Sequence, residues 1–371
     1  MPESLRMRDL RKIPGRRMMA ALRSALAIAS AVLMPMVLMP MVVMSAPLMS
    51  AVGVTASWLS LLPVPAAAAG RDGEMVIIDT DIGDDISDAL AVGLALSSPE
   101  LKVLGITSSL GDTALRARLL DRIVRDAGCP AITVAAGAAR HRRGEADFTQ
   151  ARFAAAEPAR PHPAAVDFLL EEIRRHPDDI TVIALAPLSN LGAAFERDPH
   201  TFRKLKRIVM MGGSIHRGYD AGGGHRRGPD AEYNVAMDVA AARAVLASGV
   251  PLHVIPLDAA RQRLDAAGRR AIFTSDTRLG ADLSTLYREW AEASRRRTPV
   301  LYDPLAVAHA IDPELCPASP MRLTIDGRGF TRRRSGPPNS LACLRADNGR
   351  LLDFYMLRLK RAALAACPAP P

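Results

Sequence analysis

Residues 75–91 read MVIIDTDIGDDISDALA, and they place five carboxylates within ten residues directly after an apolar run. The run from Met75 to Ile78 is short, contains β-branched residues and is bounded by polar ones, which is typical of a strand buried on both faces of a parallel sheet. Open α/β sheets bind their ligands at the carboxyl ends of such strands. The stretch therefore predicts a buried strand that delivers acidic side chains to a ligand site.

The acidic residues of this stretch need a cation, protons or water in order to lie close together. Oxygen ligands suit Ca²⁺ or Mg²⁺ better than Zn²⁺, which usually recruits His or Cys. The alternative is a solvated acidic loop that caps the next helix. We favour the metal site because the carboxylates lie between a buried strand and a helical pattern.

Residues 1–70 differ in composition from the rest of the chain. A basic start is followed by an uncharged stretch from Ser24 to Gly70 that ends in PAAAAG, a pattern typical of a secretory signal. The stretch is longer than the usual apolar region, so an uncleaved membrane anchor and a true start at Met18 or Met19 are alternatives. We expect a signal peptide or anchoring leader over 1–70 and one domain over 71–371, either secreted or periplasmic, or else membrane-anchored.

The net charge of +9 owes much to this leader, which contributes seven basic and two acidic residues and leaves +4 for the domain. Two basic runs, 295–297 and 332–334, are far apart and lack interleaved aromatic residues. We interpret them as solvated faces and expect no nucleic-acid partner, with membrane contact only through an uncleaved leader.

The four cysteines are Cys129, Cys316, Cys343 and Cys367, and none has the spacing of a metal site. Export would permit disulfides in any of three full pairings. A buried free thiol at Cys129, just before Pro130, is an equally consistent alternative.

The domain begins with alternating strand and helix patterns. A helical pattern over 85–97 is followed by a strand pattern over 101–107 and a second helix that reaches Ala127. Further strands are predicted at 131–134, 180–184, 207–211 and 252–255. This alternation predicts a single α/β domain with a mainly parallel sheet that helices cover on both faces.

Two insertions and the tail interrupt the alternation. We interpret 141–163 as a lid and 216–229 as a mobile loop near the ligand, or both as tolerated surface insertions. A helix with one apolar face is predicted over 282–296, and a two-stranded ribbon over 321–344.

With these segments placed, residues 74–365 resemble the inosine-uridine nucleoside hydrolase family, which has a Rossmann-like fold. Any one of its motifs would be a weak signal, but four occur in the family's order. They are Asp79-Thr-Asp81-Ile-Gly83 leading to Asp88-Ala-Leu-Ala, Leu185-Ala-Pro-Leu-Ser-Asn190, Glu232-Tyr-Asn234 and Tyr302-Asp303-Pro304-Leu-Ala-Val.

The resemblance implies a Ca²⁺-dependent enzyme that hydrolyses the N-glycosidic bond of ribonucleosides to ribose and free base. Ca²⁺ takes six to eight oxygens, and the implied ligands are Asp81, Asp88, Asp303 and the Leu185 carbonyl, with ribose hydroxyls and water. Asp81 would also be the general base. The implied substrate-binding residues are Asp85, Asp112, Asn190, Glu232 and Asn234. A homo-oligomer, either a dimer or a tetramer, is also compatible with the resemblance.

Two of the chain's departures from the family concern the predicted metal and catalytic residues. The family's paired aspartates are Ser87-Asp88 here, after two extra residues, so Asp85 is an alternative to Asp88 as a metal ligand. Tyr302 replaces a His that commonly protonates the leaving base. A phenol with a pKa of about 10 is a poorer acid, although it can stack on a base, so His216 or His225 is an alternative acid.

Two other functions remain to be weighed. Residues 77–81 also resemble the strand-end motif of haloacid-dehalogenase-type phosphohydrolases, in which Asp79 would be the nucleophile with Mg²⁺. No clear downstream Lys and acidic pair follows, as that fold requires. A nucleoside- or sugar-binding relative without turnover would also explain Ser87 and Tyr302, and product formation would distinguish it from an enzyme.

Overall fold

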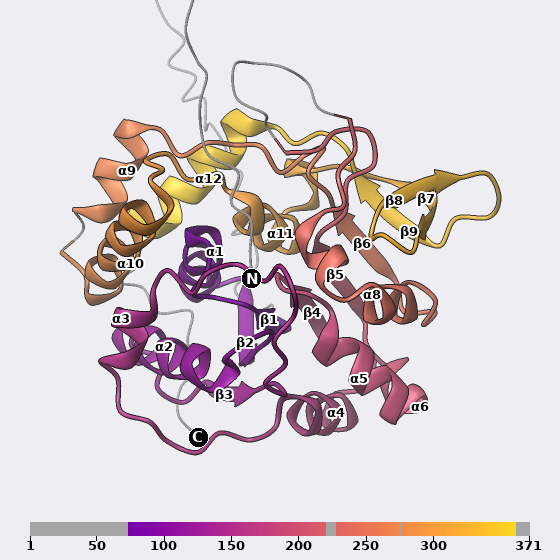
Figure 1. Ribbon diagram of the computed structural model, residues 1–371, viewed down its shortest axis with the longest axis horizontal. Helices are drawn as coiled ribbons and strands as arrows, with labels where there is room; N and C mark the ends of the chain where they lie inside the picture. Colours follow the sequence, from indigo (N-terminus) through magenta and orange to yellow (C-terminus); the bar gives the residue numbers. More distant parts are fainter. Residues whose placement is uncertain (1–72, 220–227, 275, 361–371) are drawn as a thin grey trace, which may run out of the picture. The chain divides into compact units, whose positions relative to one another are not determined.

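The computed structural model describes residues 73–219, 228–274 and 276–360 (Figure 1). The predicted leader lies outside these ranges, as do His225 and Cys367. No helix in the described ranges combines the length and the apolar character that a membrane crossing requires.

The described residues form one sheet of nine strands in the order β3-β2-β1-β4-β5-β6-β9-β7-β8. The first six strands are parallel, which confirms the predicted parallel α/β sheet. The strands are β1 (Glu74–Thr80), β2 (Leu101–Ser108), β3 (Thr133–Ala136), β4 (Thr181–Ala184), β5 (Arg207–Met211), β6 (Leu252–Ile255), β7 (Ala318–Ile325), β8 (Thr331–Arg334) and β9 (Ser340–Cys343).

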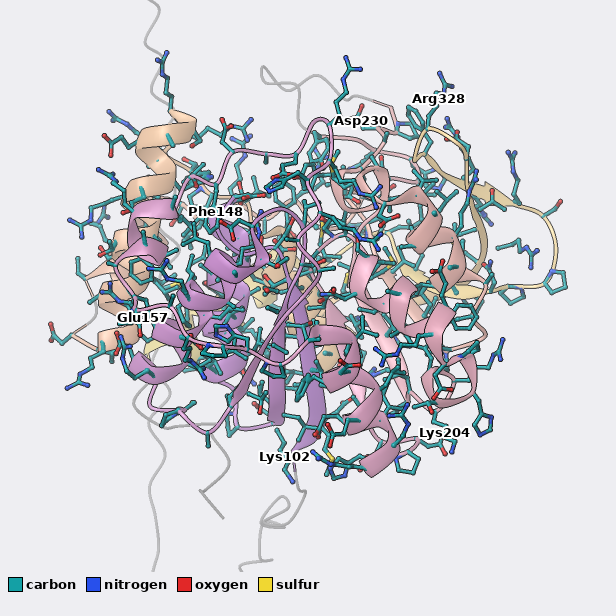
Figure 2. All side chains as sticks on the ribbon, turned by 60° about the horizontal axis from the view of Figure 1, so that its bottom comes forward. Lys102, Phe148, Glu157, Lys204, Asp230 and Arg328 are labelled. Atoms are coloured by element: carbon teal, nitrogen blue, oxygen red, sulfur yellow. A yellow bond between two sulfur atoms is a disulfide. The ribbon has the colours of Figure 1, made fainter. Side chains whose placement is uncertain are left out.

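The strand order reverses between β1 and β4. From β1 the chain moves outward through β2 to β3, and it then returns to β4 on the other side of β1. Such a reversal opens a crevice at the carboxyl ends of the two strands, where ligands of doubly wound sheets bind. Figure 2 shows Phe148 and Asp230 toward one end of the strands and Lys102 and Lys204 toward the other.

Helices cover both faces of the sheet because successive residues of β1 point to opposite sides. Val76 and Ile78 pack into one core with α1, α2, α10, α11 and α12, whereas Ile77 packs into a second core with α4, α5 and α8. The helices are α1 (Ile86–Leu96), α2 (Thr113–Asp126), α3 (Ala151–Ala155), α4 (Ala165–Arg175), α5 (Ser189–Arg197), α6 (Pro199–Phe202), α7 (Tyr233–Met237), α8 (Val239–Leu246), α9 (Ala266–Phe273), α10 (Arg278–Ser294), α11 (Tyr302–Ile311), η1 (Pro313–Leu315) and α12 (Asn348–Lys360).

The predicted two-stranded ribbon over 321–344 is wrong in its extent. β7 and β8 do form an antiparallel hairpin, but a third strand, β9, pairs antiparallel with β7 and parallel with β6. The tail therefore continues the main sheet. A disulfide joins Cys316 to Cys343 at the base of this hairpin, and the described part of the chain contains no free cysteine.

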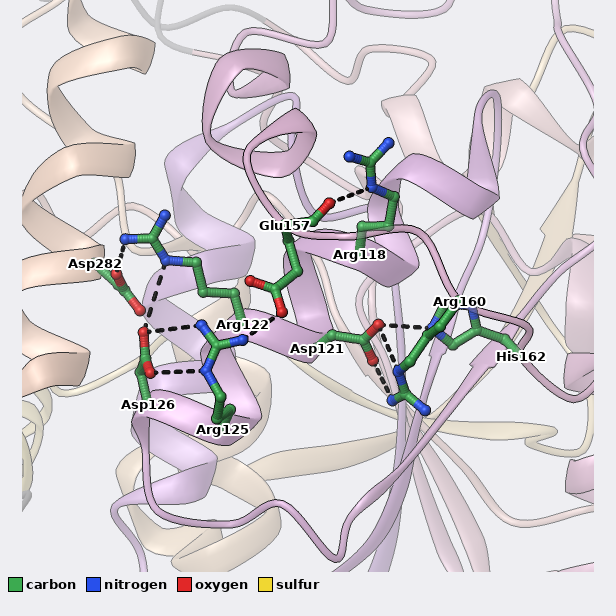
Figure 3. A network of polar contacts seen from close by, with 9 residues as sticks. All are labelled: Arg118, Asp121, Arg122, Arg125, Asp126, Glu157, Arg160, His162 and Asp282. Atoms are coloured by element: carbon green, nitrogen blue, oxygen red, sulfur yellow. Dashed lines mark hydrogen bonds and ion pairs between the residues drawn. The ribbon is translucent and has the colours of Figure 1, made fainter.

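The insertion 141–163 is held in place rather than loosely attached. Asp121 of α2 accepts hydrogen bonds of 2.9 Å from Arg160 and from His162, and Arg118 donates to the backbone carbonyl of Glu157 (Figure 3). At the other end of the insertion, Arg142 donates a 2.6 Å hydrogen bond to Asp238. The insertion is therefore a fixed cover that joins α2 to the start of α8.

Candidate active site

The end of β1 sends its side chains in two directions. Asp79 points toward α5, where its Oδ1 accepts hydrogen bonds from Thr107 at 2.5 Å and from Asn190 at 2.7 Å. Thr80 points toward α1 and donates a 2.6 Å hydrogen bond to Asp88. Because successive side chains of β1 point to opposite faces of the sheet, Asp79 is held on one face and Thr80 holds Asp88 on the other. Asp81 follows at the carboxyl end of the strand.

Asp81, Asp88 and Asp303 form a buried acidic cluster, each with 4% of its surface exposed. Burial raises the pKa of Asp81 to about 6, although Arg116 acts to lower it. Burial and the charges of Asp303 and Asp81 raise the pKa of Asp88 well above its usual value. Burial and the charge of Asp81 also raise the pKa of Asp303 well above its usual value. Binding of protons or of a cation would therefore stabilise the cluster by reducing its negative charge.

Two helix N-termini converge on this cluster. Asp88 lies in the first turn of α1 and Asp303 in the first turn of α11. The positive end of a helix dipole stabilises a carboxylate in this position. Ser87 links the two helices because its hydroxyl donates a hydrogen bond to Asp303.

Asp85 has a different role from Asp88 in this structure. It caps α1 by accepting a 2.9 Å hydrogen bond from the Ser87 amide, and its other oxygen accepts from the Trp290 indole at 3.1 Å. Asp88 accepts a hydrogen bond from Thr80 and is repelled by Asp303 and Asp81, while Asp85 repels both Asp88 and Asp303. Both aspartates therefore stay predicted alternatives for a metal ligand.

Arg116 of α2 lies behind the acidic loop with 1% of its surface exposed. Its guanidinium donates to the backbone carbonyls of Leu110, Asp81 and Ile82 and to the carboxylate of Asp84. Burial nevertheless raises the pKa of Asp84 to about 7. Arg116 was not predicted from the sequence, although its helical spacing from the apolar residues Leu119, Leu120 and Ile123 places it on the buried face of α2.

The insertion 141–163 holds the same loop from the other side. The backbone amide of Gln150 donates a 3.0 Å hydrogen bond to the carbonyl of Gly83, and the Thr149 hydroxyl donates one of 2.8 Å to the carbonyl of Asp84. The Phe148 ring packs against Gly83, where an added Cβ would lie 2.1 Å from a ring carbon. Gly83 also has a φ of +126°, so only glycine fits there without strain. Arg116 and the insertion together fix the position of Asp81.

Glu232 and Asn234 lie on the neighbouring side of the crevice. Glu232 caps α7 and accepts hydrogen bonds from the backbone amides of Gly213 and Asn234 at 2.8 and 3.0 Å, and burial raises its pKa. Asn234 donates a 2.8 Å hydrogen bond to the carbonyl of Leu185. A carbonyl oxygen has two lone pairs, so this bond orients the Leu185 oxygen and leaves it able to bind another ligand.

Two of the predicted substrate-binding residues make structural contacts. Asn190 donates to Asp79 and to the Ser108 carbonyl, so its amide faces the strands. Asp112 is exposed and caps α2 with a 3.0 Å hydrogen bond from Leu115. Neither contact tests substrate binding, and both roles stay predictions.

Tyr302 lines a small cavity beside Asp303, together with Tyr219, Arg261 and Val300. The rings of Tyr302 and Tyr219 meet edge to face with their centroids 6.2 Å apart. The hydroxyl of Tyr219 also accepts a 3.0 Å hydrogen bond from the Tyr233 amide. This residue was not predicted as part of the site because it lies in the Gly-rich insertion. The exposed His216 lines a different groove.

The donor chemistry of the crevice fits a hard cation. Carboxylates and a backbone carbonyl are the oxygen ligands that Ca²⁺ binds, and Asp79 Oδ2 is buried without a hydrogen-bond partner. Within the described residues, however, no three His, Cys, Asp or Glu side chains are arranged so as to hold a metal ion. The structure therefore gathers the predicted ligands at one edge of the sheet without showing a formed coordination shell.

Comparison with known proteins shows that nearly the whole domain is similar to nucleoside hydrolases. Residues 76–353 match the family model described as inosine-uridine preferring nucleoside hydrolase. The chain is 31% identical to uridine nucleosidase 1 of Arabidopsis thaliana over 65% of this chain and 75% of that protein. It is 32% identical to the pyrimidine-specific ribonucleoside hydrolase RihA of Citrobacter koseri over 65% of this chain and 80% of the relative.

Solved structures agree with these matches. A plant nucleoside hydrolase superposes with a TM-score of 0.68 at 26% identity, covering 77% of this chain and 99% of its own. A purine-preferring ribonucleoside hydrolase from Gardnerella vaginalis gives a TM-score of 0.65 at 25% identity, covering 78% of this chain and all of its own.

Proposed function

Since the chain belongs to the inosine-uridine preferring nucleoside hydrolase family, whose members hydrolyse N-glycosyl compounds, we propose that it splits ribonucleosides into ribose and free base with Ca²⁺ and with Asp81 as general base. The observation that carries the proposal is the convergence of Asp81, Asp88 and Asp303 in one buried cluster at the β1/β4 switch point.

Asp81 is suited to accept a proton from the attacking water. It lies at the strand end, where Arg116 donates to its backbone carbonyl and the insertion donates to the carbonyls of Gly83 and Asp84. Burial raises its pKa to about 6 in the metal-free protein, and a Ca²⁺ ion beside it would lower the pKa and keep the carboxylate ionised, as a proton acceptor must be. A proton taken up by Asp81 would also relieve repulsion within the cluster.

The other residues of the crevice would hold the substrate and the ion. Asp81, Asp88, Asp303 and the Leu185 carbonyl are the proposed Ca²⁺ ligands. Glu232, whose charge acts on Asp81 and Asp303, and Asn234 are the proposed ribose partners. When bound, the ion would supply a water molecule with a lowered pKa and would fix its position. Tyr302 would lie beside the leaving base, where its ring offers a stacking surface.

The phosphohydrolase alternative has little support. Asp79 is fully buried, and its Oδ1 is occupied by hydrogen bonds from Thr107 and Asn190. A nucleophile needs an oxygen that a substrate can approach. We therefore assign Asp79 to the support of the strand end rather than to chemistry.

We also propose that the domain works outside the cytoplasm, as a secreted or periplasmic enzyme or at the end of a membrane anchor. The disulfide between Cys316 and Cys343 supports this proposal because such bonds persist in oxidising compartments. Fractionation of cells that express the full chain, with N-terminal sequencing of the product, tests it. A full-length reduced protein in the cytoplasm would contradict it.

The enzymatic proposal is tested by incubating the purified domain with uridine, cytidine, inosine and adenosine, with Ca²⁺ or with a chelator. Both curated relatives described above are named for uridine or pyrimidine substrates, so uridine is the first compound to test. Chromatography should detect equal amounts of ribose and base, and only with Ca²⁺. Nucleoside binding without product from any of the four would support the non-catalytic alternative.

A further inference from the structure

A second, larger groove lies on the same edge of the sheet as the acidic cluster. It has a volume of about 1060 Å³, and its wall includes Arg217, Arg261 and Arg345. Arg217 follows β5, Arg261 follows β6 and Arg345 follows β9. Because these three strands run parallel, the residues after them gather at the carboxyl edge, where doubly wound sheets bind ligands.

The groove adjoins the place proposed for the leaving base. Arg261 lines both this groove and the small cavity that contains Tyr219 and Tyr302. Tyr302 immediately precedes Asp303 of the acidic cluster. A ligand whose base lies against Tyr302 could therefore extend a substituent past Arg261 into the groove.

Within the described residues, the three acidic side chains in the wall of the groove form no ion pair with Arg217 or Arg345. The carboxylate of Asp258 accepts hydrogen bonds from the backbone amides of Ile215 and His216, at 2.8 Å each. Asp347 caps α12 by accepting a hydrogen bond from the Arg350 amide. Glu314 lies beside Arg350, with 3.9 Å between the nearest charged atoms.

Two cations remain available for a ligand. Arg217 and Arg345 are exposed, and in the described part of the chain neither meets a carboxylate. The N-terminus of α12, a helix of 13 residues, also begins in the wall of the groove at Asn348. The Asp347 carboxylate already caps this end of α12, so the attraction for an anion comes from the two arginines.

We propose that this groove binds an anionic group on the leaving base, so that the enzyme favours ribonucleosides whose base carries a carboxylate or phosphate substituent. The inference rests on the proposed function, because it needs the base to lie against Tyr302. Arg217 and Arg345 would contact the anion directly and would act on substrate binding rather than on the chemical step.

The test compares uridine with 5-carboxymethyluridine, which carries a carboxylate on the side of the base away from the sugar, and with uridine 5′-phosphate. We expect a KM about tenfold lower for 5-carboxymethyluridine than for uridine, since hydrogen bonds to charged groups are among the stronger ones in proteins. The double variant Arg217→Ala/Arg345→Ala should lose this advantage and keep its KM for uridine. Arg322→Ala, an exposed arginine of β7 outside the groove, should keep the advantage.

Equal KM values for the two nucleosides, or an advantage that survives in the double variant, would overturn the inference. So would an advantage for uridine 5′-phosphate that the double variant abolishes, because the anion would then come from the sugar. Calorimetry with 5-carboxymethyluracil separates the inference from the proposed function. If uridine is not hydrolysed, tighter binding of this base than of uracil that depends on both arginines still supports the groove, and equal binding rejects it.

Discussion

The side-chain amide of Asn234 holds the backbone carbonyl of Leu185 through a 2.8 Å hydrogen bond. If the Leu185 oxygen binds Ca²⁺, Asn234 fixes its direction without touching the ion. Loss of such a supporting contact typically costs 10- to 100-fold in metal affinity. We expect Asn234→Leu to weaken Ca²⁺ binding at least tenfold in calorimetry. Asn339→Leu, which removes contacts to Leu323 in the hairpin, should leave the affinity unchanged, and unchanged affinity in Asn234→Leu would remove Leu185 from the ligand set.

Asp81→Asn should abolish turnover while the protein stays folded. Loss of a general base lowers kcat by about 10² to 10⁴, and weaker Ca²⁺ binding should add to that loss. The kcat for uridine measures the effect, and circular dichroism checks the fold. Near-normal turnover in Asp81→Asn, together with a dead Asp79→Asn variant and a trapped phosphoaspartate, would restore the phosphohydrolase alternative.

The stability of the Ca²⁺-free protein should fall as the pH rises from about 4 to about 7. The pKa of Asp81 is raised from 3.8 to about 6 and that of Asp84 from 3.8 to about 7. Because both values are higher in the folded state, protonation favours folding, and this contribution is lost as the pH passes through them. Thermal melts at pH 5 and pH 8 with a chelator should show it.

Added Ca²⁺ should raise the melting temperature more at pH 8 than at pH 5, because protons compete for the same carboxylates and a ligand of the folded state stabilises it. Asp84→Asn should flatten the pH dependence of the chelated protein. Melts that are independent of both pH and Ca²⁺ would contradict the proposed metal site.

Tyr302→Phe should retain most activity on natural nucleosides, whereas Tyr302→Ala should raise KM through the loss of a stacking surface. A phenol contributes little as an acid at neutral pH. Steady-state kinetics on uridine and on a nitrophenyl riboside decide between the two roles. If Phe is as damaging as Ala on uridine but harmless on the activated riboside, the hydroxyl protonates the leaving base.

Arg116→Met should destabilise the protein by about 3–5 kcal/mol, because it leaves the buried carboxylate of Asp84 without its partner. Arg116→Lys keeps the charge but lacks the planar fork that reaches three backbone carbonyls, so we expect it to recover only part of the loss. Urea unfolding of the Ca²⁺-free proteins measures both. Arg174→Met, which breaks an exposed ion pair with Asp198, should cost less than about 1 kcal/mol; a similar cost at Arg116 would show that its contacts do not support the loop.

The parallel part of the sheet could be predicted because its strands are buried on both faces and read as continuous apolar runs. The bounds of β5 and β6 match the predicted strands at 207–211 and 252–255. The edge of the sheet could not be predicted in the same way. β9 is four residues long, and its pairing with His253 and Val254 of β6 is a long-range contact that local periodicity does not encode.

In the candidate site, too, some residues could be predicted from the sequence and others could not. Asp81, Asp88 and Asp303 were identified from motifs, and the structure brings them together. The groups that hold them were not identified, because Arg116, Phe148 and Tyr219 act through contacts between segments far apart in the chain. Asp112 was predicted from its position after Gly111 to contact the sugar, which stays a prediction, and the motif did not indicate that its carboxylate also caps α2.

The disulfide at the base of the β7/β8 hairpin makes this part of the chain suitable for engineering. Cys316 and Cys343 are 27 positions apart, and the bond between them closes the loop that contains the hairpin. Residues 335–338 within this loop are exposed, and an added Cβ at Gly336 would meet nothing within 4 Å. Since the ends of the loop stay joined whatever its length, a peptide tag or fluorophore site inserted there should leave the opposite side of the sheet, and the acidic cluster with it, unchanged.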